Sequence, residues 1–100
     1  MSDTRTIEDI KVNTKLAKKY IVYILNDNYS TVDFVIATLM KFFDKSFEDA
    51  KDITNKVHHE GRGVCGIYTK QIAEMKTYEA NQFAKINSQP LKTIFLLEGE

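Results

Sequence analysis

The residues of this chain that could do chemistry gather in two stretches. The first, Asn26-Asp27-Asn28-Tyr29-Ser30, follows the apolar run YIVYIL, which stops abruptly. The second, VHHEGRGVCG at residues 57–66, holds both histidines and the single cysteine. A thiol, an imidazole and a carboxylate are the parts of a cysteine hydrolase, and histidine is a common metal ligand. The spacing of these residues decides between such chemistry and plain structural roles.

The two adjacent histidines do not have the spacing of a metal site. On a helix, His58 and His59 would point about 100° apart, so they could bind one ion together only with distortion. No H-x-x-x-H or C-x-x-C spacing accompanies them. We therefore expect no metal and no cofactor. A histidine at the end of a helix would instead interact favourably with the helix dipole.

A cysteine hydrolase would use Cys65 as nucleophile, His58 as base and Asp27 as the orienting group. Cys65, however, falls inside a strand pattern, between Val64 and Gly66. A cysteine in such a place usually behaves as a small buried apolar residue. Ser30 is a weaker candidate nucleophile, because its position before a helix explains it as a cap. The sequence thus favours a protein that is not an enzyme.

The elements that must position these residues begin with a strand at Tyr20–Leu25, which is β-branched and aromatic. A helix follows, and Ser30 with Asp33 resembles a capping box at its start. A second helix begins after Ser46, and Gly61 is well placed to end it. Helical spacing predicts the inward-facing residues of these two helices to be Val32, Val35, Ile36, Leu39, Met40, Phe43 and then Phe47, Ala50, Ile53, Val57.

The rest of the chain predicts a strand, a helix and a strand. In GRGVCGIYT, Gly63 and Gly66 indicate a close backbone approach or a bulge. Thr69 is placed to cap a third helix, which runs to about Asn87 and has a narrow, alanine-rich inner face. After Pro90, residues 91–97 form the last strand. The order strand-helix-helix-strand-helix-strand predicts a two-layer α+β domain, with three helices packed on a small three-stranded antiparallel sheet.

Length and composition exclude several classes of protein. With 100 residues, 43% of them hydrophobic, the chain fits one small domain, which we divide into a flexible N-terminal extension (1–18) and a folded core (19–100). Lys+Arg and Asp+Glu number 14 each, and their mixing argues against a nucleic-acid binder. No segment has the length of a membrane span or the pattern of a signal peptide. A cytoplasmic monomer is expected.

Three sets of segments resemble the Clp-protease adaptor family, ClpS. They are IVYILNDNYSTVDFVIATLMKFF, VHHEGRGVCGIYT with AEMK, and QPLKTIFLLE, and they cover about residues 20–98. The Asn-Asp loop, the Phe-Val pair, the Val-His pair and the glycine-cysteine strand occur in the family's order. The resemblance implies a non-enzymatic adaptor. Such adaptors bind proteins with a bulky hydrophobic first residue, an N-degron, and deliver them to a Clp ATP-dependent unfoldase and protease.

The resemblance also implies roles for individual residues. Asn26, Asp27 and His58 would bind the substrate's α-amino group, an ammonium that has donors and no acceptor. A hydrophobic pocket for the first substrate residue would be formed by Ser30, Val32, Val35, Thr54, Val57 and Leu91. The N-terminal domain of the Clp AAA+ unfoldase would contact Tyr29, Gln71, Glu74, Met75 and Lys76.

Four positions depart from the usual pattern of the family. Asn28 replaces a second acid and Thr31 a proline, while Val32 and Thr54 each stand where methionine is common. The resemblance implies that position 32 guards the pocket mouth, where methionine excludes β-branched first residues. We expect these changes to leave the ammonium site intact and to alter the preference of the pocket.

One alternative function comes from architecture alone. The C-terminal domain of the bacterial ribosomal stalk protein has a similar arrangement of elements, so a different protein-binding module could share this fold. A stalk domain needs no ammonium site. The combination of Asn26, Asp27 and His58 therefore favours the adaptor over this alternative.

Overall fold

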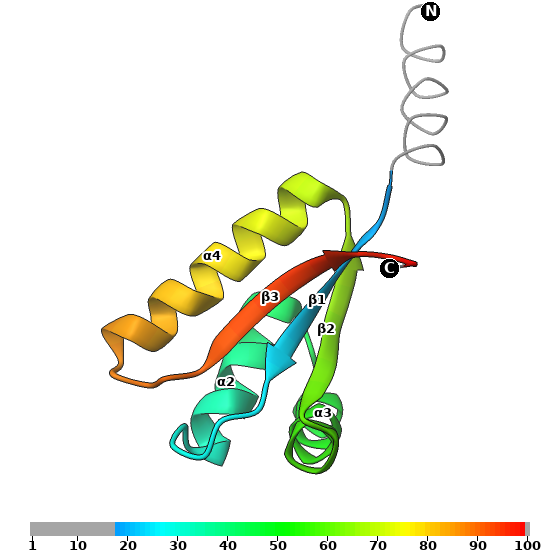
Figure 1. Ribbon diagram of the computed structural model, residues 1–100. Coiled ribbons are helices and arrows are strands. Elements are labelled where there is room, and N and C mark those ends of the chain that lie inside the picture. Colours follow the sequence, from blue (N-terminus) through cyan, green and yellow to red (C-terminus); the bar gives the residue numbers. More distant parts are fainter. Residues whose placement is uncertain (1–17, 100) are drawn as a thin grey trace, which may run out of the picture.

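The computed structural model describes residues 18–99, so the N-terminal extension predicted from the sequence lies outside the described residues except for Lys18. Three strands form one antiparallel sheet in the order β2-β1-β3 (Figure 1). The predicted α+β class, element order and three-stranded antiparallel sheet are confirmed. The elements are β1 (Tyr20–Leu25), α2 (Val32–Phe43), α3 (Phe47–Glu60), β2 (Arg62–Tyr68), α4 (Lys70–Ile86) and β3 (Lys92–Leu97).

The core lies between the sheet and the three helices. Val22 and Ile24, on the inward side of the central strand β1, are fully buried. Each helix contributes fully buried residues to the same cluster, namely Leu39 from α2, Ala50 from α3 and Ala80 from α4. Small alanines on α3 and α4 let these helices approach the sheet closely. The opposite face of the sheet is open, and its exposed apolar residues are Val64, Ile67 and Leu96.

The start of α2 differs from the predicted capping box. Thr31 is the N-cap, and its hydroxyl accepts the Phe34 N–H at 3.1 Å. The Ser30 hydroxyl is buried and has no hydrogen-bond partner among the described residues. The Ser30 amide is already bound to the Asp27 carboxylate. The prediction that Ser30 caps α2 in a capping box with Asp33 was therefore wrong by one residue. The Asp27 carboxylate binds the Ser30 amide and keeps Ser30 in the loop.

The other predicted helix ends are confirmed. Ser46 is the N-cap of α3, with its hydroxyl accepting the Asp49 N–H at 3.1 Å. Gly61 ends this helix in the left-handed conformation, with φ at 92°, where glycine carries no steric penalty. Thr69 stands at the N-cap position of α4, although its side chain makes no capping hydrogen bond. Asn87 follows the last turn of α4.

Some residues predicted to face inward are exposed. Val32, Met40 and Phe47 are 61%, 41% and 53% exposed, respectively. By contrast, the polar residue Thr38 on α2 is fully buried. Its hydroxyl donates to the Phe34 carbonyl at 2.9 Å. A helical threonine can enter a core because the backbone one turn earlier accepts its proton.

β2 shows both features that its glycines predicted, a close backbone approach and a bulge. A Cβ atom on Gly63 would come within 2.7 Å of a Val57 methyl, so a glycine here lets β2 lie directly against α3. The strand register jumps at Cys65, because Val22 pairs with Gly66 and Tyr23 pairs with Val64. This bulge lies next to the second glycine.

Asn81 attaches α4 to the edge strand β3. Its side-chain oxygen accepts the Thr93 N–H at 2.8 Å and the Thr93 hydroxyl at 3.0 Å, and its NH₂ group donates to the Thr93 carbonyl at 3.1 Å. Thr93 is 1% exposed, so water cannot replace these bonds. The carboxamide therefore pairs with the outer edge of β3 much as another strand would.

We expect Asn81→Leu to lower the free energy of unfolding by about 2–4 kcal/mol, because the Thr93 N–H and carbonyl lose their partners at about 1–3 kcal/mol each. Leucine keeps a similar side-chain volume. Urea denaturation measures the change, and Gln82→Leu at the next position is the control. A loss no larger than that of the control would contradict this role of Asn81.

Candidate functional site

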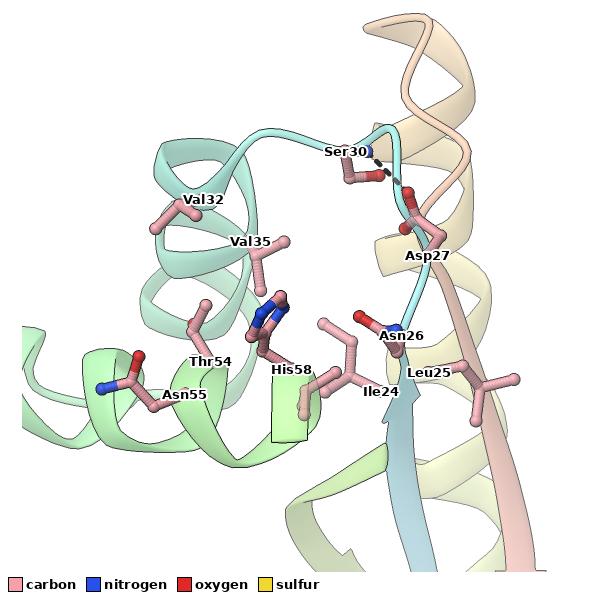
Figure 2. A pocket seen from close by; sticks show the side chains of 11 residues that line it. Ile24, Leu25, Asn26, Asp27, Ser30, Val32, Val35, Thr54, Asn55 and His58 are labelled. Atoms are coloured by element: carbon pink, nitrogen blue, oxygen red, sulfur yellow. Dashed lines mark hydrogen bonds between the residues drawn. The ribbon is translucent and has the colours of Figure 1, made fainter. Parts of the chain in front are cut away.

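A cavity of about 230 Å³ opens between the end of β1, the start of α2 and the second half of α3 (Figure 2). An apolar cavity of roughly 150 Å³ can hold benzene, so this cavity has room for an aromatic ring. Its walls come from segments that are distant in sequence. The lining residues are Ile24, Leu25, Asn26, Asp27, Ser30, Val32, Val35, Thr54, Asn55, Val57 and His58.

The polar groups of the cavity gather at the side of β1. In Figure 2, the side-chain oxygen of Asn26 points towards the imidazole of His58, with Asp27 above it. A backbone hydrogen bond from the Asn26 N–H to the Gly61 carbonyl, at 2.9 Å, joins the end of β1 to the end of α3. Because His58 lies in the last turn of α3, this bond sets the two side chains beside one another. Val35 and Val57 supply apolar wall.

Asp27 shapes the loop that forms the upper rim. Its Oδ1 atom accepts the N–H groups of Tyr29 at 2.8 Å and Ser30 at 2.6 Å, an arrangement in which an aspartate side chain closes a turn. Partial burial acts to raise the pKa of Asp27, but the hydrogen bonds from Ser30 and Tyr29 outweigh it and lower the pKa below its ordinary value. The carboxylate is therefore ionised at neutral pH. This end of the cavity consequently carries a negative charge.

Eight of the nine residues predicted for the ammonium site and the hydrophobic pocket line this cavity: Asn26, Asp27, Ser30, Val32, Val35, Thr54, Val57 and His58. The ninth, Leu91, is buried in the core and is not part of the lining.

Sequence reasoning missed three lining residues. Ile24 could have been found, since it alternates with Val22 on the inward side of β1. Leu25 also lines the cavity, at the last position of the strand. Asn55 is an exposed polar residue on α3, and nothing in the sequence pattern distinguishes it from a solvated helical position.

The residues predicted for the unfoldase contact fall into two groups. Gln71, Glu74 and Met75 are exposed on the first turns of α4. Tyr29, 82% exposed, precedes the start of α2. Lys76 also belongs to α4, and its Nζ donates to the Phe42 carbonyl near the end of α2 at 2.8 Å. Tyr29 therefore comes from a different part of the fold than the four residues on α4.

Cys65 does not have the properties of a catalytic thiol. It is fully buried on β2, and it does not line the cavity. Burial raises the pKa of Cys65 to about 12, so the thiol stays protonated at neutral pH. A hydrolase built on Cys65 would have no thiolate nucleophile.

Residues 18–99 contain neither a metal-binding cluster nor a helix that could span a membrane. No group of three or more His, Cys, Asp or Glu side chains in this range is arranged to hold a metal ion. In the same part of the chain, no helix combines the length and the apolar character needed to cross a bilayer.

Comparisons with known proteins find relatives of this sequence and of this architecture. Residues 15–94 match the family described as ATP-dependent Clp protease adaptor protein ClpS. The ClpS adapter of Helicobacter hepaticus is 48% identical over 77 residues, covering 77% of this chain and 78% of its own. That of Bdellovibrio bacteriovorus is 47% identical over 76 residues, covering 76% and 67%.

A solved structure of Agrobacterium tumefaciens ClpS2 bound to L-phenylalaninamide is similar throughout. It superimposes with a TM-score of 0.80 at 30% identity and covers 82% of this chain and 99% of that one. The similarity therefore extends to nearly the whole of the ClpS2 chain.

Proposed function

The chain belongs to the ClpS family of ATP-dependent Clp protease adaptors, and we propose that its cavity binds the first residue of substrate proteins through their free α-amino group. The protein is thus an adaptor for proteolysis and not an enzyme. Because the chain belongs to this family, the alternative of a ribosomal-stalk-like module no longer applies.

The observation that carries the proposal is the convergence of acceptors at one end of an apolar cavity. An α-ammonium group has three donors and a positive charge. Asn26 offers an amide oxygen, neutral His58 a ring nitrogen, and Asp27 a negative charge. The side chain of the first residue would then enter the apolar part between Val35 and Val57. L-Phenylalaninamide, the ligand of the similar ClpS2 structure, has a free amino group and a benzyl side chain, the two features this cavity would bind.

The expected affinity follows from these contacts. Burying a Leu or Phe side chain contributes about 1.5–3 kcal/mol, and each hydrogen bond to a charged group contributes about 1.5–3 kcal/mol. Association costs offset part of this sum. A dissociation constant on the order of micromolar results. Such an affinity suits an adaptor, because it must release its substrate to the protease.

The decisive experiment compares peptides that differ only at their first residue. Fluorescence anisotropy would be measured with labelled peptides that begin with free Phe, with N-acetylated Phe, and with free Ser. We expect only the free Phe peptide to bind with micromolar affinity, because acetylation removes the charge and two donors, and serine leaves the apolar cavity unfilled. Equal binding of the acetylated peptide would overturn the proposal.

For the partner, we propose that the exposed group of Gln71, Glu74 and Met75 on α4 contacts the N-terminal domain of a Clp AAA+ unfoldase.

Lys76 stands apart from this group because it is half-buried. Its ammonium donates to the last turn of α2 and lies 5.4 Å above the Tyr68 ring. The lysine therefore supports the packing of α4 on α2. The adaptor acts, in this proposal, as a cytoplasmic monomer.

We expect Lys76→Met and Met75→Ala to have different effects. Lys76→Met keeps the apolar stem but removes a charged hydrogen bond, so the free energy of unfolding should fall by about 1–3 kcal/mol. Met75→Ala should weaken unfoldase binding and leave stability nearly unchanged. Urea denaturation and calorimetric titration with the unfoldase domain measure both quantities. If Lys76→Met weakens unfoldase binding without loss of stability, Lys76 itself touches the partner.

A further inference from the structure

The loop between β1 and α2 is attached to the rest of the protein by a bond that comes from the opposite end of the sequence. The N–H of Thr31 donates to the side-chain oxygen Oε1 of Gln89 at 3.1 Å. Gln89 lies between α4 and β3, 58 residues further along the chain. Thr31 is the last residue before α2 and the N-cap of that helix.

Two hydrogen bonds of this loop determine its shape and not its position. The amides of Tyr29 and Ser30 bind Asp27, which belongs to the same loop. Thr31 is bonded to α2, the helix that it caps, through its hydroxyl and its carbonyl. Among the hydrogen bonds of the described residues, two tie the segment from Asn26 to Thr31 to parts of the protein other than α2. One is the Asn26 N–H to the Gly61 carbonyl at the start of the segment. The other is the bond to Gln89 at its end.

The backbone around Gln89 is fixed by contacts with α4 and with the core. The Gln89 N–H donates to the Ala84 carbonyl at 2.8 Å, which fixes it to the last turns of α4. One residue before Ala84, the Phe83 ring stacks on Phe34 of α2, with ring centroids 5.0 Å apart and planes 12° apart. After Gln89 the chain passes Pro90 and enters the core at Leu91, which is 4% exposed. The backbone at Gln89 is thus held relative to α2.

The segment that Gln89 holds forms one wall of the cavity. Ser30 directly before Thr31, Val32 directly after it and Val35 one turn further along all line the cavity, and Figure 2 shows them along the loop and the first turns of α2. Val32 is exposed at the rim, where few packing contacts fix its place. A displacement of Thr31 would therefore move the rim relative to His58 on α3.

We propose that Gln89 is a positioning residue for the binding cavity, which fixes the start of α2 and thereby the fit of the rim around the first substrate residue. The inference rests on the proposed function, since it names a residue that supports that same cavity. Gln89 does not line the cavity, so it acts through the Thr31 amide and not by contact with the ligand.

The test uses Gln89→Leu, which removes the acceptor and keeps a side chain of similar size, and Gln89→Glu, which restores an acceptor. Gln89→Leu should bind the Phe peptide about two- to tenfold more weakly, the net effect of one hydrogen bond. Gln89→Glu should bind within about twofold of wild type. Hydrogen exchange at the Thr31 amide should accelerate in Gln89→Leu and not in Gln89→Glu. A purely structural role would lower the melting temperature without changing affinity in the folded range.

A double-mutant cycle with Thr31→Pro tests the specific bond. Thr31 has a φ of −73°, which proline adopts without strain, and proline has no N–H to donate. In the Thr31→Pro background, Gln89→Leu should change affinity no further. An equal loss in both backgrounds would overturn the inference, as would unchanged exchange of the Thr31 amide in Gln89→Leu. If wild type fails to bind the free Phe peptide, the proposed function is at fault, and the exchange result still decides whether Gln89 holds Thr31.

Discussion

Asn26→Ala and His58→Ala are each expected to weaken binding of a free Phe peptide by about 10- to 150-fold, because each removes one hydrogen bond to a charged group, at about 1.5–3 kcal/mol. Neither change should unfold the protein. The structural bond of Asn26 uses its backbone N–H, which alanine retains, and His58 is exposed. Fluorescence anisotropy at neutral pH measures the effect.

The neighbouring His59 provides a matched control. It is an exposed histidine on the same turn of α3, but it does not line the cavity, so His59→Ala should bind as wild type does. The N-acetylated peptide gives a second control, since it has no ammonium group for Asn26 or His58 to bind. Affinity for the free peptide that stays unchanged in both Asn26→Ala and His58→Ala would remove these residues from the site.

The sequence predicted the elements well because each had a strong local signal. The β-branched run of β1, the hydroxyl of Ser46 at the start of α3 and Gly61 at its end each act within a few residues. The start of α2 was misplaced by one residue because two hydroxyls, Ser30 and Thr31, stand side by side. The choice between them depends on the Asp27 carboxylate, which takes the Ser30 amide into the loop.

The inward faces of the helices were harder to predict, since hydrophobicity alone does not place a residue in the core. Val32 is apolar but exposed, because it lies at the rim of the cavity. Thr38 is polar but buried, because its hydroxyl is satisfied within its own helix. In each case the outcome depends on where the three helices meet, which is a property of tertiary packing.

Most residues of the candidate site could be predicted through the family resemblance. The hydrogen bonds that hold the surrounding elements in place could not. Asn26, Asp27 and His58 belong to recognisable motifs. The bonds from Asn81 to Thr93 and from Gln89 to Thr31 join positions that are 12 and 58 residues apart. Asparagine and glutamine are common on protein surfaces, so their presence in the sequence gives no sign of such partners. Long-range polar contacts of this kind appear only once the chain is folded.

Val32 and Thr54 are the lining residues that bear most directly on which first residues are accepted. Both stand where the family often has methionine. Val32 is 61% exposed at the rim, and valine is shorter than methionine and stiff at its first side-chain torsion. The Thr54 hydroxyl donates to the Ala50 carbonyl at 2.7 Å, so its proton is already used within α3. The rim of this cavity is therefore less filled than it would be with methionines.

We expect the wild-type protein to accept peptides that begin with Ile as well as Leu, and Val32→Met to reduce the affinity for Ile selectively, by about tenfold or more. Leu and Ile have equal volume and differ in the position of the branch, so the longer side chain at residue 32 would meet the β-methyl of Ile. A steric conflict of one methyl group is worth about 1–3 kcal/mol. The measurement is the ratio of Leu to Ile dissociation constants in both proteins.

Ala37→Met, which adds the same side chain to α2 outside the cavity, should leave that ratio unchanged. A wild-type protein that rejects Ile as sharply as Val32→Met does would show that another group closes the rim, and the Gln89-anchored loop would then be the first place to look.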